Sequence, residues 1–443
     1  MTVNFTELGL GAALVRALED KGYSQPTPIQ VQAIPEVLQG SDVLATAQTG
    51  TGKTASFALP ILELLAESDY GKRDVRALIL TPTRELAEQI DRNIKRYSSN
   101  LHLPSAVLVG GVPVRGQIRQ LNQQPAIVVA TPGRLMDLLQ QQLLSLAKVE
   151  VLVLDEADRM LDMGFIHDVK KIVAQIPKDR QTLLFSATLS KAIVELSSSM
   201  LRCPKRIEIA PSATIADNLA QSVYFVEQDK KRDLLTKTLR DLSGKRVLVF
   251  TRTKHRANRL AQQLSRSGIS ADAIHSNKSQ NARRRTLAAF DRGQVNVLIA
   301  TDVVARGIDV KEISHVINYE LPDEPESYIH RIGRTARAEC SGSAYSFCDS
   351  TEVGTLQSIE RLTKQKLTVA AERTYHSELA SSRYLTAQAP RKNHRGGQGG
   401  GHGSRRGQGG GGRGRVASSK RRTGSRHFGS KGPKRQSNRR AWA

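Results

Sequence analysis

The sequence predicts an α/β protein with two tandem parallel-sheet domains, a short linker and a basic C-terminal tail. Two series of short apolar runs alternate with helix-like stretches, which is typical of a parallel sheet covered on both faces. A stretch rich in Ala, Ser and Thr without apolar periodicity separates the two series. The predicted parts are residues 1–209 (first domain), 210–221 (linker), 222–370 (second domain) and 371–443 (a low-complexity, disordered tail).

The expected strands are the apolar runs themselves, because a strand buried on both faces has little room for polar side chains. The first series comprises residues 43–45, 77–80, 127–130, 151–154 and 183–185. The second series comprises residues 247–250, 271–274, 297–300, 316–319 and 344–347. The tail begins where this periodicity weakens, and from residue 390 its composition is mainly Gly, Arg, Lys, Ser and Gln.

Charge is concentrated in this tail. The formal net charge is +24, and residues 391–443 hold 16 Lys and Arg but no Asp or Glu. Such a segment predicts a polyanionic partner, and nucleic acid is favoured over membrane because no amphipathic helix or lipidation signal accompanies the charge. We expect a cytoplasmic protein with no membrane segment, since no signal peptide or long apolar run is present. The three cysteines lack metal-site spacing and are expected to be reduced.

A phosphate-binding loop is predicted at residues 47–54, between an expected strand and an expected helix. Gly50 and Gly52 allow the backbone N–H groups to turn inward, and the following helix adds the positive end of its dipole. Lys53 can reach the β- and γ-phosphates of a nucleotide, and the Thr54 hydroxyl can bind a Mg²⁺ ion that bridges them. Ala47 occupies the first glycine position of the general pattern, so a Gly/Thr-rich turn is the alternative.

Two adjacent carboxylates, Asp155 and Glu156, follow the expected strand at residues 151–154. A carboxylate at the carboxyl end of a strand can bind the metal, and its neighbour can deprotonate a water that attacks the γ-phosphate. Asp155 is therefore the candidate Mg²⁺ ligand and Glu156 the candidate general base. A solvated acidic turn is the alternative, but it does not explain the buried strand before the pair.

Together these residues resemble the DEAD-box RNA helicase family, named after the letters at Asp155, Glu156, Ala157 and Asp158. The resemblance spans roughly residues 5–340, and the details at residues 165–168 and 277–280 look most like the bacterial RhlE type. Ser276 and Glu339 stand where relatives commonly have Gly. The matching motifs lie in family order at residues 22–30, 47–54, 82–87, 110–111, 131–134, 155–158, 186–188, 249–252, 280–283, 301–309 and 330–337.

The resemblance implies that the two domains are RecA-like. It also implies ATP and Mg²⁺ as cofactors and assigns residues to the ATP site. Gln30 can read the adenine edge through its amide, and Phe5 resembles the aromatic that stacks on the base. Arg334 and Arg337 resemble arginine fingers that neutralise the transferred phosphoryl group. Ser186, Thr188 and His330 resemble residues that couple the ATP and RNA sites. The implied nucleotide-binding residues are Phe5, Tyr23, Gln30, Thr49, Gly50, Thr51, Gly52, Lys53, Thr54, Gly307 and Asp309.

The resemblance also implies RNA contacts that meet mostly phosphate and sugar, which would position the strand without reading its sequence. The residues that match are Thr83, Arg84, Gly111, Thr131, Arg134, Arg252, Gln280, Arg283, Thr301 and Arg306. The predicted activity is RNA-stimulated ATP hydrolysis coupled to RNA clamping and local duplex separation. Two alternatives are an ATP-gated clamp that remodels ribonucleoprotein with little strand separation, and an RNA-annealing scaffold that acts through the tail. Ribonucleoprotein or RNA-decay proteins are the expected partners.

Overall fold

The computed structural model describes residues 3–47, 50–67, 74–209, 219–302, 313–335, 341–371 and 373–388. Compact packing defines one unit, Met1–Ala389, and the remainder of the chain, Pro390–Ala443, lies outside the described residues. The expected linker lies mostly outside them as well.

The first half of the chain forms a seven-stranded, all-parallel sheet in the order β3-β4-β2-β5-β6-β1-β7. Its strands are β1 (Val43–Thr46), β2 (Ala77–Leu80), β3 (Ser105–Leu108), β4 (Ile127–Ala130), β5 (Val151–Leu154), β6 (Gln181–Ser186) and β7 (Lys205–Glu208). The helices that accompany it are the 3₁₀ helix η1 (Thr6–Leu8), α1 (Ala12–Glu19), α2 (Pro28–Leu38), α3 (Lys53–Glu67), α4 (Arg84–Tyr97), α5 (Val114–Leu121), α6 (Pro132–Gln140), α7 (Ala157–Asp162), α8 (Ile166–Val173) and α9 (Lys191–Met200).

The second half forms another seven-stranded parallel sheet, in the order β10-β11-β9-β12-β13-β8-β14. Its strands are β8 (Leu219–Phe225), β9 (Val247–Phe250), β10 (Ala271–Ile274), β11 (Val297–Ala300), β12 (His315–Asn318), β13 (Gly342–Cys348) and β14 (Thr368–Val369). The described helices are α10 (Lys231–Asp241), α11 (Lys254–Arg266), α12 (Gln280–Asp291), α14 (Pro325–Ile332), α15 (Val353–Thr363) and α16 (Glu378–Gln388). Counted from its own first strand, each sheet has the same order, 3-4-2-5-6-1-7, so the predicted pair of parallel-sheet domains is confirmed.

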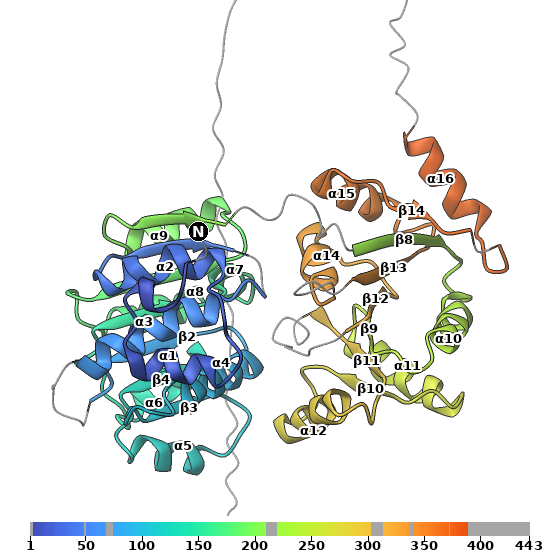
Figure 1. Cartoon of the computed structure of the whole chain (residues 1–443). Coiled ribbons are helices and arrows are strands. Elements are labelled where there is room, and N and C mark those ends of the chain that lie inside the picture. Colours follow the sequence, from blue (N-terminus) through green and yellow to red (C-terminus); the bar gives the residue numbers. More distant parts are fainter. Residues whose placement is uncertain are drawn as a thin grey trace, which may run out of the picture. The chain divides into compact units, whose positions relative to one another are not determined.

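Helices cover both faces of each sheet (Figure 1). In the first domain, alternate residues of β5 point to opposite sides, so that Val153 joins one core and Leu152 and Leu154 join another. In the second domain, α10 and α11 pack on one face, and Phe290 of α12 packs on the other. This two-sided burial explains why the central strands read as continuous apolar runs.

Two predicted boundaries need correction. Strand β8 begins at Leu219, inside the predicted linker. The sequence did not reveal this start, because the half-buried residues of β8 resemble a polar connector. The predicted tail also begins too early, because α16 lies inside it and buries Ala380 and Tyr384 against the second domain. The hydroxyl of Tyr384 donates a hydrogen bond to Glu360 at 2.6 Å.

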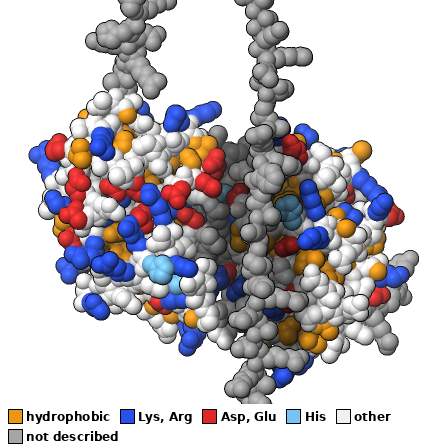
Figure 2. All heavy atoms as spheres, turned by 180° about the vertical axis from the view of Figure 1, so that it is seen from behind, with side chains coloured by type: hydrophobic (Ala, Val, Ile, Leu, Met, Phe, Trp, Pro, Cys, Tyr) orange, Lys and Arg blue, Asp and Glu red, His pale blue; other side chains and the backbone are white. Residues whose placement is uncertain are grey.

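On the face drawn in Figure 2, Lys and Arg side chains lie among Asp and Glu side chains, and hydrophobic side chains are scattered between them. Within the described residues, none of the helices combines the length and apolar character that a membrane crossing requires. Cys203 and Cys348 are unpaired, and Cys340 lies outside the described residues.

Candidate nucleotide and RNA site

Most of the predicted site residues of the first domain follow the carboxyl ends of its strands. Because all seven strands are parallel, these ends share one edge of the sheet. The segments that begin there are residues 47–54 after β1, 81–84 after β2, 109–112 after β3, 131–134 after β4, 155–158 after β5 and 187–188 after β6.

The phosphate loop has the backbone that its glycines predict. Gly50 and Gly52 both have φ of +93°, a conformation that side-chain-bearing residues rarely adopt. A Cβ atom on Gly52 would lie 2.5 Å from Nε2 of Gln30, so this glycine also allows a close approach. Gln30 Nε2 donates to the Gly52 carbonyl at 3.2 Å, and Gln30 Oε1 accepts from the Thr27 N–H at 2.9 Å. Gln30 therefore connects α2 to the loop, and its contact with adenine stays a prediction.

Lys53 begins α3, and its ammonium group donates to the Ala47 carbonyl at 2.9 Å across the mouth of the loop. Its side chain is buried. Thr51 and Thr54 are partly buried, and Thr49 lies outside the described residues.

Asp155 and Glu156 are both buried directly after β5. Burial raises the pKa of Asp155 to about 7, and the nearby positive charge of Lys53 opposes this shift. One carboxylate oxygen of Asp155, Oδ1, is buried without a hydrogen-bond partner. Glu156 has φ of 54° and ψ of 51°, the left-handed conformation, which is uncommon for a residue other than Gly, Asn or Asp. Strained backbone of this kind is often found at functional sites.

Sequence reasoning missed the partner of Glu156. Arg159 Nη1 lies 2.9 Å from Glu156 Oε2, and both side chains are almost fully buried. The position of Arg159, three residues further on, is the signal that could have suggested this contact, because α7 brings residues three and four apart together.

Asp158 links the acidic segment to the segment after β6. Its Oδ2 accepts hydrogen bonds from the Ala187 N–H at 3.1 Å and the Thr188 hydroxyl at 3.3 Å. The Ser186 hydroxyl donates to the Thr188 carbonyl at 2.7 Å. Thr188 thus contacts the predicted catalytic segment directly, and Ser186 is connected to that segment through Thr188.

The two aromatic residues predicted for the nucleotide differ in exposure. Phe5 is 4% exposed and belongs to the core of the first domain. Tyr23 is 41% exposed and packs edge-on against Tyr97, with ring centroids 6.2 Å apart. Stacking of Phe5 on a base stays a prediction, and it requires the Phe5 ring to become accessible.

The predicted RNA contacts of the first domain lie in neighbouring loops. The guanidinium of Arg84 lies against Gly110 and Gly111, since a Cβ on Gly111 would be 1.9 Å from Arg84 Nη1. Arg134 donates to the Val112 carbonyl at 3.3 and 3.4 Å from its two terminal nitrogens. Thr83 and Thr131 directly precede α4 and α6. The structure therefore brings these residues to one edge of the sheet, as the motif order predicts.

In the second domain, Arg252 belongs to a buried ionic network. Its Nη2 donates to Glu352 Oε1 at 2.6 Å, and its Nε donates to the Leu321 carbonyl at 2.8 Å. Glu352 also pairs with Lys231, which is 1% exposed and lies 3.0 Å from Asp349. Burial raises the pKa of Glu352, although Lys231 opposes the shift. The position of Arg252 is thus fixed by Glu352, which is itself paired with Lys231, and sequence reasoning identified neither residue.

Gln280 and Arg283 contact carboxylates of α4. Gln280 Nε2 donates to Glu85 Oε1 at 3.0 Å, and Arg283 Nη2 donates to Glu85 Oε2 at 2.6 Å. Arg284 pairs with Glu88 at 2.6 Å. These carboxylates occupy Nε2 of Gln280 and Nη2 of Arg283, whereas Nε of Arg283 is buried without a hydrogen-bond partner. The contact of both residues with RNA stays a prediction.

The remaining predicted residues lie around α14. Arg334 is 4% exposed, and its Nε donates to the His330 carbonyl at 3.3 Å. Arg331, to which sequence reasoning gave no role, is fully buried and makes two hydrogen bonds to Asp302, beside Thr301. The predicted residues that lie outside the described part of the chain here are Arg306, Gly307, Asp309 and Arg337.

Comparison with known proteins gives concordant matches. Residues 27–196 match the DEAD/DEAH box helicase family, and residues 230–339 match the helicase conserved C-terminal domain. The chain is 40% identical over 384 residues to the DEAD-box ATP-dependent RNA helicase CshA of Bacillus cereus, a match that covers 87% of this chain and 73% of that protein. It is 41% identical over 363 residues to CshA of Geobacillus kaustophilus, covering 82% and 77%.

Two solved structures have a similar fold. One is S. cerevisiae Dbp5 bound to RNA and ADP BeF3, with a TM-score of 0.76 and 31% identity over 83% of this chain and 95% of that chain. The other is the DEAD-box helicase Mss116 bound to ssRNA and UDP-BeF, with a TM-score of 0.78 and 28% identity over 87% of this chain and 83% of that chain. These relatives are named CshA, Dbp5 and Mss116, so the RhlE-type subclass is not confirmed.

Proposed function

The chain belongs to the DEAD-box family of ATP-dependent RNA helicases, and on that premise we propose that Lys53, Asp155 and Glu156 form its ATP-hydrolysing site. The protein is thus an RNA-binding, ATP-hydrolysing helicase. The observation that supports this site most strongly is the burial of both carboxylates at the carboxyl end of β5, where the charge of Lys53 acts on Asp155.

In this proposal Lys53 binds the phosphates of ATP and Glu156 accepts a proton from the attacking water. Lys53 would exchange its hydrogen bond to the Ala47 carbonyl for phosphate oxygens. The ion pair with Arg159 holds the Glu156 carboxylate in place for this role. Arg159 is therefore a positioning residue for the base.

The residues fit a Mg²⁺ ion. Asp155 has a buried carboxylate oxygen without a partner, and its raised pKa means that a nearby cation would stabilise the ionised form. Asp155 and the hydroxyl of Thr54 would hold the ion, which supplies charge neutralisation at the phosphates.

The second domain would complete the site and bind RNA. Arg334 and Arg337 are proposed as arginine fingers, and Gly307 and Asp309 as further nucleotide contacts. RNA would be held through its backbone by Arg84, Arg134, Arg252 and the other predicted residues, without reading of base sequence. RNA binding would be transmitted to the catalytic segment by Ser186, Thr188 and His330. Asp158 supports this proposal because it accepts hydrogen bonds both from the Arg159 N–H and from the segment that contains Thr188.

We further propose a cytoplasmic location and partners in ribonucleoprotein remodelling or RNA decay. The unpaired Cys203 and Cys348 are consistent with a reducing compartment. A strand-displacement assay separates a helicase that opens duplexes from a clamp that only holds RNA.

Two variants test the division of roles. Lys53→Ala should lose ATP affinity and all RNA-stimulated turnover, because the phosphates lose their point charge. Glu156→Gln should still bind ATP and RNA but hydrolyse slowly, with kcat lower by on the order of 10²–10⁴-fold, because only the general base is removed. The measurements are binding of a fluorescent ATP analogue and steady-state ATPase rates with and without RNA.

A wild-type rate in Glu156→Gln would show that another group activates the water. Unchanged ATP affinity in Lys53→Ala would show that the phosphates of ATP do not bind at residues 47–54.

A further inference from the structure

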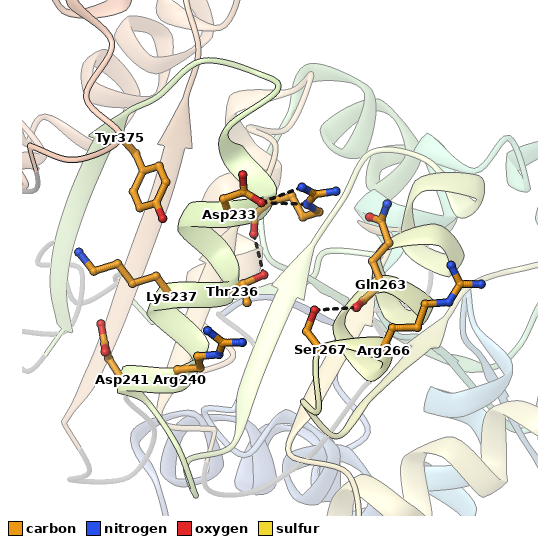
Figure 3. Close-up of a pocket in the computed structure, with 10 residues that line it drawn as sticks. Asp233, Thr236, Lys237, Arg240, Asp241, Gln263, Arg266, Ser267 and Tyr375 are labelled. Carbon is orange, nitrogen blue, oxygen red and sulfur yellow. Dashed lines mark hydrogen bonds and ion pairs between the residues drawn. The ribbon is translucent and has the colours of Figure 1, made fainter.

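A polar pocket lies between α10 and α11 of the second domain, on the face of the sheet that these helices cover. Its volume is about 620 Å³, which exceeds the lower limit of usual small-ligand sites. Residues of α10 and α11 line it together with Tyr375, which lies beside Lys237 in Figure 3. None of the predicted ATP or RNA residues lines it.

The pocket extends along α10 from its first turn to its last, and so reaches the edge of the sheet opposite to the motif residues. Arg232 and Asp233 in the first turn of α10 line it. So do the last turns of α10 and α11, which lead into the amino ends of β9 and β10. The motif residues Arg252 and Thr301 instead follow the carboxyl ends of β9 and β11. Helix α11 has 13 residues, so at 1.5 Å per residue it spans about 20 Å between these two edges.

Cationic side chains dominate the pocket and its surroundings. Arg232, Lys237, Arg240 and Arg266 line it together with two carboxylates, and one of these, Asp233, already accepts from Arg232 at 2.9 Å. Arg240 and Arg266 are exposed, and neither has a side-chain partner among the described residues. The guanidinium groups are therefore available to an anion.

The positive charge continues along α11 toward the motif residues. A smaller hollow of about 280 Å³ adjoins the pocket, shares Arg232 and Gln263 with it and adds Arg256 and Arg259. Between Lys254 and Arg266, helix α11 contains four Lys or Arg residues and no Asp or Glu. Arg256 and Arg259 thus form a cationic path between the pocket and Arg252, two residues before α11. Arg256 in this path is already paired with Glu320, and Asp229 adds one carboxylate to the hollow.

Neutral groups in the pocket suit a nucleotide rather than a bare anion. The ring of Tyr375 is partly buried, with the ammonium of Lys237 5.9 Å from its centroid, and an aromatic ring offers a stacking surface for a base. Gln263 lies on the opposite side and presents a side-chain amide. Cations that follow a strand, combined with an aromatic platform, are typical of single-stranded nucleic acid sites.

We propose that this pocket and the cationic path along α11 bind the RNA strand where it extends beyond the motif residues. The inference rests on the proposed function, since it assumes that RNA enters at Arg252 and its neighbours. Cations at helix C-termini also favour the helix dipole, which explains why Arg240 and Arg266 stand there. That effect does not account for their convergence with an aromatic ring on one hollow.

The test uses the full chain with Arg240→Glu and Arg266→Glu combined, and an oligouridylate series of increasing length. A short oligomer that fills only the motif site should bind and stimulate ATP hydrolysis as in the wild type. A long oligomer should bind roughly tenfold more weakly at low salt, because two phosphate contacts become repulsive. In Arg240→Gln with Arg266→Gln, the slope of log affinity against log salt should fall by ~1.4 for the long oligomer, ~0.7 for each contact.

Arg361→Glu with Arg383→Glu is the matched control. Both residues are exposed, belong to α15 and α16, and make the same change in net charge. The inference is overturned if the pocket variant loses no more long-RNA affinity than this control, and an acidic peptide would then be the better occupant. It is also overturned if short and long oligomers weaken equally. Absence of RNA-stimulated ATP hydrolysis in the wild type would instead refute the proposed function itself.

Discussion

Glu156 combines a left-handed backbone with an almost fully buried charge, and both features cost free energy. The backbone conformation costs on the order of 1–3 kcal/mol for a side-chain-bearing residue. Arg159 offsets the burial of the charge, because the two side chains form an ion pair almost without solvent contact. The pair lies at the residue that we propose as the general base.

Replacing Arg159 with Met should therefore affect both stability and catalysis. We expect Arg159→Met to lower the free energy of unfolding by about 3–5 kcal/mol, since it leaves a buried carboxylate uncompensated. The kcat of RNA-stimulated ATP hydrolysis should also fall, because the Glu156 carboxylate loses the partner that positions it. Denaturant titration and steady-state ATPase rates with RNA are the two measurements.

The double variant Arg159→Met with Glu156→Gln is the control for this pair. It should recover part of the lost stability, because the orphaned charge is gone. If the double variant is as unstable as Arg159→Met plus Glu156→Gln taken separately, the ion pair contributes nothing, and Arg159 acts only through packing.

At the scale of elements, the central strands could be predicted almost residue by residue, whereas most edge strands could not. β2, β4, β5, β9 and β11 coincide with the expected apolar runs, and β10 is the one described edge strand that does so too. Of the four missed strands, β3, β7 and β14 lie at edges, where one side of the strand meets solvent and the apolar run is interrupted. The fourth, β8, lies between β13 and β14 and was missed because most of its residues are only partly buried. The sequence of β7, for example, is Lys-Arg-Ile-Glu, with only Ile207 buried.

The residues of the candidate site also fall into those that could be predicted from the sequence and those that could not. Lys53, Asp155 and Glu156 could be predicted because each belongs to a local strand-loop-helix pattern with a known chemical purpose. The support of Arg252 by Glu352 and Lys231 could not, since these residues are about 100 positions apart or come from different helices, and only the folded sheet brings them together. The packing of Arg84 on Gly111 is another contact between separate loops.

That packing gives a prediction for the loop after β3. Gly111→Ala should displace the Arg84 guanidinium, because the new Cβ would lie 1.9 Å from Nη1, and φ is +73°. We expect a loss of about 1–2 kcal/mol in stability from the left-handed backbone and a several-fold higher KM for RNA in the ATPase assay.

Gly116→Ala in α5 is the matched control. A Cβ there meets nothing within 4 Å, and Ala favours the helix over Gly by about 1 kcal/mol. Stability should hold or rise, and KM for RNA should stay at the wild-type value. An equal rise of KM in both variants would argue against a specific role for the Gly111–Arg84 contact.

For the whole molecule, the uneven charge predicts a separable RNA tether. Removing residues 391–443 deletes 16 positive charges and no negative ones. The slope of log affinity against log salt should become shallower by ~0.7 for each RNA phosphate that the tail no longer neutralises, while ATP turnover at saturating RNA should barely change. Fluorescence of Trp442, the single tryptophan, should shift when RNA is added to the full chain. An unchanged slope and an unresponsive Trp442 would indicate a segment that only aids solubility.

The shared strand order has a consequence for synthesis on the ribosome. In the first domain, β1 pairs with β6 and β7. Val43 therefore lacks one of its two neighbouring strands until Lys205 has been synthesised. In the second domain, β8 likewise pairs with β13 and β14. At roughly 5–20 residues per second, the first strand stays without its last neighbour for on the order of 10–30 seconds. In each domain, therefore, the strand that is synthesised first is among the last to gain both of its neighbours. The strand that precedes the phosphate loop, β1, has both neighbours only after β7 has been synthesised.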